Sequence, residues 1–486
     1  MATETELKLA VAPADWGRLK RRLARWGAPQ RTTLLARYLD TDEALLARQR
    51  MGLRLRREGE RWIQTLKTEG RAGALTARGE WNSPARIVAG QPVVDALALA
   101  ETPLAPVLSE SFVAGLKTRF EVRMRRASWC VDFAGAQIEI ALDRGQVRAA
   151  GARAPVAELE LELLSGPRLA LIELALQLVQ GQGREQPLAL LCAVESKAGR
   201  GLRLMRSARV EPSPPAAAAR CWRPLAPAPV MLRELLPAWV ANLAANARGL
   251  AELELSEYRH QTQAVLQRIR TARRVLAERE DFPARLDREL MWLARALRRP
   301  CDAGRLRRGV RDEGAPTRCE PAPRCDALSV RELGARHGSA LESPRFAQLM
   351  LELLAWAESP APQPSGETAG RRLVRRLELQ AARLQRRLIG LESFDSCAWR
   401  RVRLRAEGLR FAIELTTPSG PWPEALDALE QAATRVVELD QARAALGQRQ
   451  HEAERSEFGA RVQAAREQGL AAGRRVLSLD RSELGV

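Results

Sequence analysis

Acidic side chains alternate with other residues in two segments of the chain. In TETELKLAV, a β-strand would place Glu4, Glu6 and Lys8 on one face, because alternate residues of a strand share a face. In VAELELELL, the same spacing aligns three acids, Glu158, Glu160 and Glu162. Like charges on one strand repel, so something must compensate them. Mg²⁺ prefers carboxylate oxygens, and these five glutamates are therefore candidate ligands for a divalent metal.

Basic side chains follow the same alternation in GLRLRRE, RWIQTLKTE and KTRFEVRMRRASW. The chain has 78 Lys and Arg against 59 Asp and Glu, a net charge of +19 that favours polyanionic ligands. An arginine fork binds two phosphate oxygens at once. We expect a cationic cradle for phosphate groups built from Lys8, Arg54, Arg56, Lys67, Arg119, Arg123, Lys197 and Arg200.

A scaffold must bring these faces together. For one strand alone, a solvated face of an antiparallel sheet explains the pattern. A closed barrel with a charged interior explains all the strands at once, with the apolar faces turned outward. The segments PADWGRLKRRLARWG and RLALIELALQLVQG have helical periodicity, and we expect them to lie between the strands as amphipathic helices.

The segment from Glu211 to Pro229 is dense in Pro and Ala and predicts a linker. Short alternating segments precede it and long helical patterns follow it. The predicted fold class is α+β, with an N-terminal antiparallel β domain at 1–205, a linker at 206–228 and an all-helical domain at 229–486.

Composition narrows the possible locations and partners. No apolar run approaches the roughly 20 residues that span a bilayer, and the acidic, polar N-terminus does not resemble a signal peptide. We therefore expect a cytoplasmic protein without a membrane partner. The seven cysteines lack paired zinc spacing; Cys319 and Cys325 come nearest to it, and free thiols are the better interpretation. Only 4% of residues are aromatic, which disfavours nucleic acid held by base stacking.

The first part of the chain resembles CYTH domains, the triphosphate tunnel metalloenzymes. Glu4-x-Glu6-x-Lys8 is similar to their ExExK signature. Further segments are similar to the family's in the same order along residues 1–205: YLDT, LRLR, WIQTLK, IEIALDRG, ELELELLSG and SKAGRGLRL. The last departs from the family's SKAERGYRL at Gly199 and Leu202.

The resemblance implies an eight-stranded antiparallel tunnel with flanking helices that binds a triphosphate and Mg²⁺ or Mn²⁺. It places the metal on Glu4, Glu6, Glu158, Glu160 and Glu162, and catalysis on Lys67, Arg56 and Glu160. Hydrolysis by water then needs no protein nucleophile, only positioning and charge stabilisation. Inorganic triphosphatase is the usual activity of fused two-domain members. The family also includes thiamine triphosphatases, RNA triphosphatases and a class of adenylyl cyclases. We rank adenylyl cyclase lowest among the possible activities, because no feature of the sequence selects adenine.

The helical part resembles CHAD domains. HQTQAVLQRIRTA and RRVRLRAEGLRFAIE are similar to that family's two motif helices, and SPRFAQLMLELLAW to a third segment. The resemblance implies a duplicated helical bundle whose basic surface binds inorganic polyphosphate, here through His260, Arg270, Arg403 and Arg410. Gln263 and Gln267 stand where the pattern has Arg, and Glu407 where it has Lys. We therefore predict weak polyphosphate binding.

The predicted function is divalent-metal-dependent hydrolysis of inorganic triphosphate to diphosphate and phosphate, beside a polyanion-binding helical domain. One alternative is a non-catalytic module that binds polyphosphate or RNA. Another is a triphosphatase that acts on thiamine triphosphate or nucleotides. The many acids favour an enzyme, since binding alone would not need them. The oligomeric state and the number of metals remain open.

Overall fold

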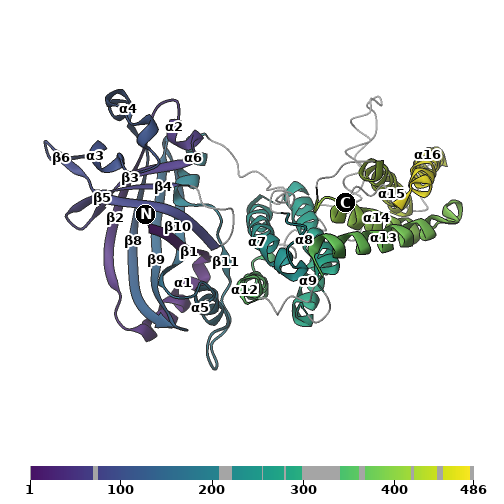
Figure 1. The fold of residues 1–486 in the computed structure, drawn as a ribbon, viewed down its shortest axis with the longest axis horizontal. Coiled ribbons are helices and arrows are strands. Elements are labelled where there is room, and N and C mark those ends of the chain that lie inside the picture. Colours follow the sequence, from purple (N-terminus) through teal and green to yellow (C-terminus); the bar gives the residue numbers. More distant parts are fainter. Residues whose placement is uncertain are drawn as a thin grey trace. The chain divides into compact units, whose positions relative to one another are not determined.

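The computed structural model describes residues 2–68, 75–206, 222–253, 256–277, 281–297, 340–360, 367–416, 421–445 and 452–481 (Figure 1). The chain divides into two compact units. The first holds Met1–Pro214, Leu236–Thr262 and Ser339–Ser359, and the second holds Pro215–Leu235, Gln263–Gly338 and Pro360–Val486. Most of the predicted linker lies outside the described residues, as do Cys221, Cys301, Cys319 and Cys325. The described cysteines, Cys130, Cys192 and Cys397, are unpaired thiols.

Eight antiparallel strands form a closed barrel in the first unit, as the sequence predicts. Lys8 pairs with Glu160 where the last strand meets the first, so the sheet has no open edge in this ring. In order around the barrel the strands are β1 (Ala2–Val11), β5 (Leu75–Pro84), β4 (Arg61–Thr68), β3 (Met51–Glu58), β2 (Gln30–Asp40), β8 (Lys117–Phe133), β9 (Ala136–Ala149) and β10 (Ala152–Ser165).

Apolar side chains on the outside of the barrel are covered by helices. A cluster around Leu53, Leu55 and Leu66 packs beneath short helices, α2 (Leu45–Arg48), α3 (Ala96–Leu99) and α4 (Glu110–Gly115). The two predicted amphipathic helices are present as α1 (Pro13–Leu23) and α5 (Leu169–Gln180). The short strand β11 (Leu190–Cys192) adds to β1, and β6 (Arg86–Val88) and β7 (Gln91–Val93) form a separate hairpin.

One end of the barrel interior is apolar and carries a helix. Ala36, Phe120 and Val122 belong to this buried cluster, and helix α6 (Lys197–Met205) packs against it through Leu202. A Cβ atom on Gly201 would clash with the ring of Phe120, so glycine permits the close approach. Helix α6 is held in this place, and its first residues therefore enter the barrel interior from the end.

The remaining described elements are helices. No helix among the described residues combines the length and apolarity needed to cross a membrane. Helices α13 and α14 pack against each other, as do α14 with α15 and α15 with α16. The helices are α7 (Ala228–Leu253), α8 (Ser256–Leu276), α9 (Ala284–Ala296), α12 (Pro344–Glu358), α13 (Ala369–Leu388), α14 (Ser396–Ile413), α15 (Pro421–Ala445) and α16 (Glu452–Ser478).

Candidate active site

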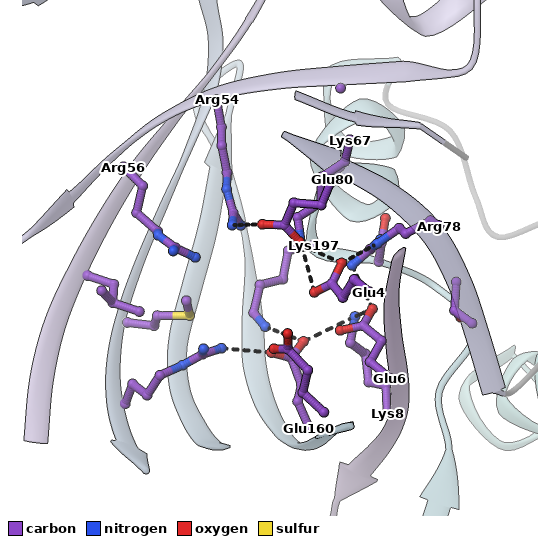
Figure 2. Close-up of a pocket in the computed structure, with 18 of the residues that line it drawn as sticks. Glu4, Glu6, Lys8, Arg54, Arg56, Lys67, Arg78, Glu80, Glu160 and Lys197 are labelled. Atoms are coloured by element: carbon purple, nitrogen blue, oxygen red, sulfur yellow. Dashed lines mark hydrogen bonds and ion pairs between the residues drawn. The ribbon is translucent and has the colours of Figure 1, made fainter. Parts of the chain in front are cut away.

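The barrel encloses a charged cavity of about 1890 Å³ (Figure 2). All eight strands and α6 contribute to its lining. Among the lining residues ten are basic and seven acidic. Three of the bases are exposed, so the buried and half-buried part of the lining holds seven bases and seven acids. The cavity contains nine of the predicted site residues: Glu4, Glu6, Lys8, Arg54, Arg56, Lys67, Glu160, Glu162 and Lys197.

Carboxylates and bases of β1, β4 and β5 form one network in the cavity wall. The Arg78 guanidinium lies 2.9 Å from Glu4 and 2.6 Å from Glu6. The Lys67 ammonium lies 2.8 Å from both Glu4 and Glu80. Strand register explains these contacts, because Glu4 faces Arg78 across one ladder and Lys67 faces Glu80 across the next. The first two glutamates of the chain are therefore held by bases.

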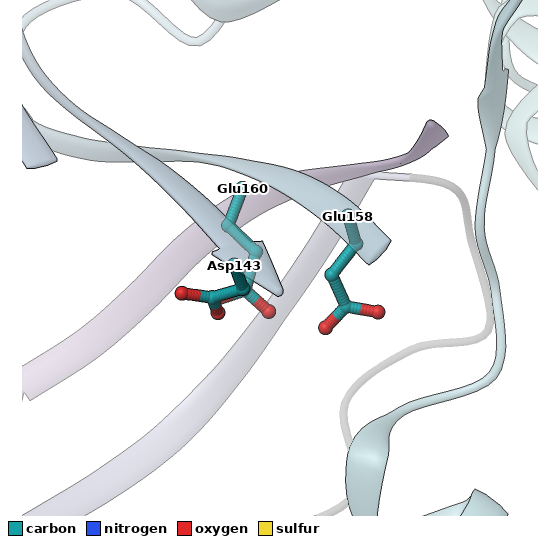
Figure 3. Close-up of side chains that lie close together, drawn as sticks. All are labelled: Asp143, Glu158 and Glu160. Carbon is teal, nitrogen blue, oxygen red and sulfur yellow. The ribbon is translucent and has the colours of Figure 1, made fainter. Parts of the chain in front are cut away.

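A second network surrounds the ammonium of Lys197, which α6 brings into the barrel. Lys197 Nζ lies 2.9 Å from Asp143 and 2.8 Å from Glu160, and it also contacts Glu158. Oxygen atoms of these three carboxylates lie within 4.8 Å of one another, close enough to hold a metal ion (Figure 3). In this arrangement the Lys197 ammonium compensates their charge.

Two further bases complete the second network. Arg126 donates to both oxygens of Asp143, at 2.8 and 2.7 Å, and to Glu160 at 2.7 Å. Lys8 Nζ lies 3.1 Å from Glu160. Burial would raise the pKa of Glu160, but Lys197, Lys8 and Arg126 outweigh it and hold that pKa well below its usual value. Glu160 therefore stays ionised at the centre of three cations.

Glu162 has the opposite environment. Burial, followed by the negative charge of Glu4, raises its pKa to about 7. Across the sheet it faces Glu6 on β1 and Glu139 on β9. Among the described residues, no base forms an ion pair with Glu162 or Glu139. Within the described part of the chain, Glu162 and Glu139 therefore lack a paired base, and a divalent cation coordinated by oxygen would supply the missing positive charge.

The structure corrects the placement of Arg119 and Arg123, which lie outside the cavity. Arg119 donates to Asp42 at 2.8 Å, and the half-exposed Arg123 pairs with Glu121 at 2.9 Å. Strand alternation predicts that the charged face of β8 points inward. Its inward face instead begins with Phe120, Val122 and Met124, which fill the apolar end of the barrel, and only then reaches Arg126.

Two more predicted residues, Arg200 and Glu158, are buried beside the cavity and do not line it. Arg200 donates to the Pro155 carbonyl at 2.8 Å and lies 3.4 Å from Glu158. Glu158 also contacts Lys197. This pair lies at the start of α6 and helps to position Lys197, and a direct contact of either side chain with a ligand stays a prediction.

Sequence reasoning did not select four residues of the networks: Arg78, Glu80, Arg126 and Asp143. A signal was present for three of them, because Arg78 and Glu80 alternate with Gly79 in ARGEWN and Asp143 shares a strand face with Glu139 in QIEIALD. Arg126 has the same strand parity as apolar residues, so alternation alone pointed to the wrong face.

In the second unit, acids occupy part of the predicted polyanion-binding face. Arg410 donates to Glu430 at 3.0 Å and also contacts Glu414. Arg403 and Arg270 lie near Glu407, whose pKa is raised to about 7 by burial. Gln263 donates to the Leu297 carbonyl at 2.8 Å, so this side chain hydrogen-bonds the C-terminal end of α9. In the first unit, His260 is exposed on α8.

Comparison with known proteins agrees with this architecture. Residues 2–187 match the model of the CYTH domain and residues 230–458 that of the CHAD domain. An inorganic triphosphatase from Haemophilus influenzae is 32% identical over 169 residues, which cover 34% of this chain. The match spans 46% of that relative, about half its length.

Two solved structures are similar with low scores, which add nothing to the family assignment. The CHAD domain of Ricinus communis is 19% identical, with a TM-score of 0.41, over 56% of this chain and 98% of that domain. A Hippeastrum protein described with a dominant triphosphatase activity is 15% identical, with a TM-score of 0.26, over 33% of this chain and 80% of that one. On the family models, the chain contains a CYTH domain at residues 2–187 and a CHAD domain at residues 230–458.

Proposed function

We propose that the CYTH domain hydrolyses inorganic triphosphate to diphosphate and phosphate with the help of Mg²⁺ or Mn²⁺. The observation that carries this proposal is the single cavity into which Lys8, Arg54, Arg56, Lys67 and Arg126 all project, with carboxylates between them. A triphosphate carries several negative charges on a short, flexible chain. A ring of cations can contact all its phosphate groups at once, and carboxylates alongside can hold the accompanying metal.

Binding of the substrate would exchange partners within the existing networks. Lys67 and Arg78 now hold Glu4 and Glu6. When phosphate oxygens take over these bases, the two carboxylates lose their counter-charges and become available to a metal. The same exchange avoids a state with unpaired charges in the cavity, which would cost several kcal/mol.

The residues suited to hold the metal are Glu4, Glu6, Glu160 and Glu162. They fit an oxygen-loving divalent cation because Glu162 lacks a basic partner among the described residues and the other three lie on the same and neighbouring strands. When bound, the metal supplies charge neutralisation and orientation of the attacking water. Glu158, predicted as a ligand, is better suited to positioning Lys197.

The remaining chemistry is charge stabilisation by fixed cations. Burial, followed by repulsion from Arg54, lowers the pKa of Arg56 to about 10, so this guanidinium is still charged at neutral pH. Arg56 and Lys67 would bind phosphate oxygens and stabilise the negative charge of the transition state, with Glu160 holding Lys8 and Lys197 in place. No protein nucleophile is required.

The CHAD domain would bind a polyanion, for which inorganic polyphosphate is our candidate. Its predicted motif face carries Arg403 beside Glu407, and Arg410 is paired with two acids. This supports weak binding at that face. The unpaired described thiols suit a reducing compartment such as the cytoplasm.

The test is phosphate release from inorganic triphosphate, thiamine triphosphate and ATP, each with Mg²⁺, with Mn²⁺ and with EDTA. We expect inorganic triphosphate to turn over fastest and EDTA to stop the reaction. Faster release from another substrate would reassign the substrate while keeping the enzyme. If no substrate shows metal-dependent release, the tunnel is a binding module and the proposal fails.

A further inference from the structure

Four arginines form a compact group on the outer side of α13 and α14. Arg383 and Arg387 lie one turn apart on α13, and Arg401 and Arg405 lie one turn apart on α14. Residues four apart share a helix face, and the two helices pack against each other. Arg383, Arg401 and Arg405 are exposed, and Arg387 is half-buried. We call these four residues the outer arginine cluster.

No acid neutralises the outer arginine cluster within the described part of the second unit. None of the four forms an ion pair or a hydrogen bond with a carboxylate there, whereas Arg372 and Arg375 on the same helix both pair with Glu367. The Nε atom of Arg387 is buried without a hydrogen-bond partner. Like charges four residues apart on one helix destabilise that helix unless a counter-charge is present.

Arg405 lies within electrostatic range of the other three arginines of the cluster. The pKa of Arg405 is lowered by burial and then by the charges of Arg387, Arg383 and Arg401. An anion bound among them would remove this repulsion. Arginine is suited to the task because its planar fork makes two parallel bonds to a phosphate group.

The motif face of the CHAD domain differs in this respect. Arg410 is held by Glu414 and Glu430, and Arg268 lies 2.6 Å from Glu414. Glu407 also lies on that face, where it would repel an anion whenever it is ionised. The positive charge available to a ligand is therefore greater at the outer arginine cluster than at the motif face.

We propose that the outer arginine cluster is the principal polyphosphate-binding surface of this chain. The proposal rests on the polyanion role proposed for the CHAD domain, and it moves the site away from the motif residues. A nucleic acid is disfavoured because single strands need aromatic side chains for stacking. Helix α13 has no aromatic residue, and Trp399 on α14 is fully buried.

The experiment measures binding of long-chain inorganic polyphosphate to the full chain in EDTA, so that the result does not depend on hydrolysis. The variant Arg383→Gln/Arg387→Gln/Arg401→Gln/Arg405→Gln should bind about tenfold more weakly or worse. Its dependence of log Kd on log salt should also become shallower by about 3, because each lost phosphate contact removes about 0.7. Triphosphate hydrolysis should remain unchanged, which separates this test from that of the proposed function.

A matched control removes the same charge from dispersed, exposed positions on α9, α15 and α16: Arg288→Gln/Arg295→Gln/Arg435→Gln/Arg475→Gln. This variant should lose less than about threefold in affinity, since only general attraction changes. If the quadruple cluster variant does not fold, Arg401→Gln/Arg405→Gln should lose about half of the salt dependence attributed to the cluster.

Three outcomes would overturn the proposal. Equal losses in the cluster variant and the dispersed control would show attraction by net charge alone. A larger loss in Arg403→Gln/Arg410→Gln would return the site to the motif face. Displacement of polyphosphate by RNA at equal phosphate concentration would mark the cluster as a nucleic-acid surface.

Discussion

The barrel and the helical unit are both rich in bases, but they place their charges on opposite sides of their secondary structure. In the barrel the charges point inward, and the side chains of Lys8 and Lys197 are each only 8% exposed. In the helical unit the apolar stripe of α13, from Leu373 to Leu388, points inward, and four of its arginines are exposed: Arg371, Arg375, Arg383 and Arg386.

This difference determines how the barrel and the helical unit can each bind an anion. A buried charge without a partner lowers the stability of the fold by several kcal/mol. The cations inside the barrel therefore form ion pairs with carboxylates before any substrate binds. On a helix surface, water and salt ions compensate the charge instead. The barrel must therefore exchange ion partners when it binds, whereas the helical surface only releases counterions.

Glu160→Gln should have the largest effect, about 100-fold or more on kcat/KM for inorganic triphosphate. The change removes the carboxylate that Lys8, Arg126 and Lys197 share, together with a proposed metal ligand. Glu173→Gln, on an exposed position of α5, is the matched control and should keep full activity. Wild-type rates in Glu160→Gln would show that the tunnel is not the site of hydrolysis.

A pair of double variants tests the inward and outward faces directly. Arg56→Ala/Lys67→Ala should reduce kcat/KM by about 10- to 100-fold, because hydrogen bonds to charged groups contribute roughly 1.5–3 kcal/mol each. Arg119→Ala/Arg123→Ala removes the same charge from outside the cavity and should stay within about twofold. Steady-state kinetics of both proteins would decide the matter, and similar losses would mean that charge, regardless of its position, controls the rate.

Gly201→Ala should destabilise the barrel by about 1–3 kcal/mol, because the added methyl group clashes with Phe120 at the apolar end. The measurement is thermal unfolding. Gly199→Ala on the same helix is the control, since its methyl group meets its nearest atom at an ordinary 3.5 Å. If both variants unfold at the same temperature, α6 does not pack tightly against the barrel interior.

The smallest effect concerns pH in the helical unit. Burial raises the pKa of Glu407 to about 7 from an ordinary 4.5, and the negative charge of Glu430 adds to this rise. The positive charges of Arg403, Arg410 and Arg270 lower the pKa but do not outweigh burial. The folded unit therefore keeps this proton to higher pH than the unfolded chain does. Its stabilising contribution is complete below about pH 4.5 and is lost as the pH rises through about 7.

Glu407→Gln keeps the uncharged form at every pH. It should raise the unfolding temperature by about 2–4 °C at pH 8 and leave it nearly unchanged at pH 5. Glu378→Gln, at an exposed position of α13, is the control. A variant that melts with wild type at pH 8 would show that Glu407 is not appreciably desolvated.

Much of the site could be predicted because strand alternation is a local property. Glu4, Glu6 and Lys8 share a face in any strand that contains them, as do Glu160 and Glu162 in theirs, and the barrel does bring both faces inward. The same reasoning failed for Arg119 and Arg123. A strand of 17 residues crosses both the apolar and the charged end of the interior, so its inward face changes character along its length.

The sequence by itself determined the alternating faces, the change from strands to helices and the residues that carry charge, since each depends on near neighbours in the chain. Only the tertiary structure decided which acid holds which base. The contacts of Lys197 with Asp143, Glu158 and Glu160 require strand register, barrel closure and a helix packed into the barrel end. Those features arise from pairings far apart in the sequence, and no local pattern specifies them.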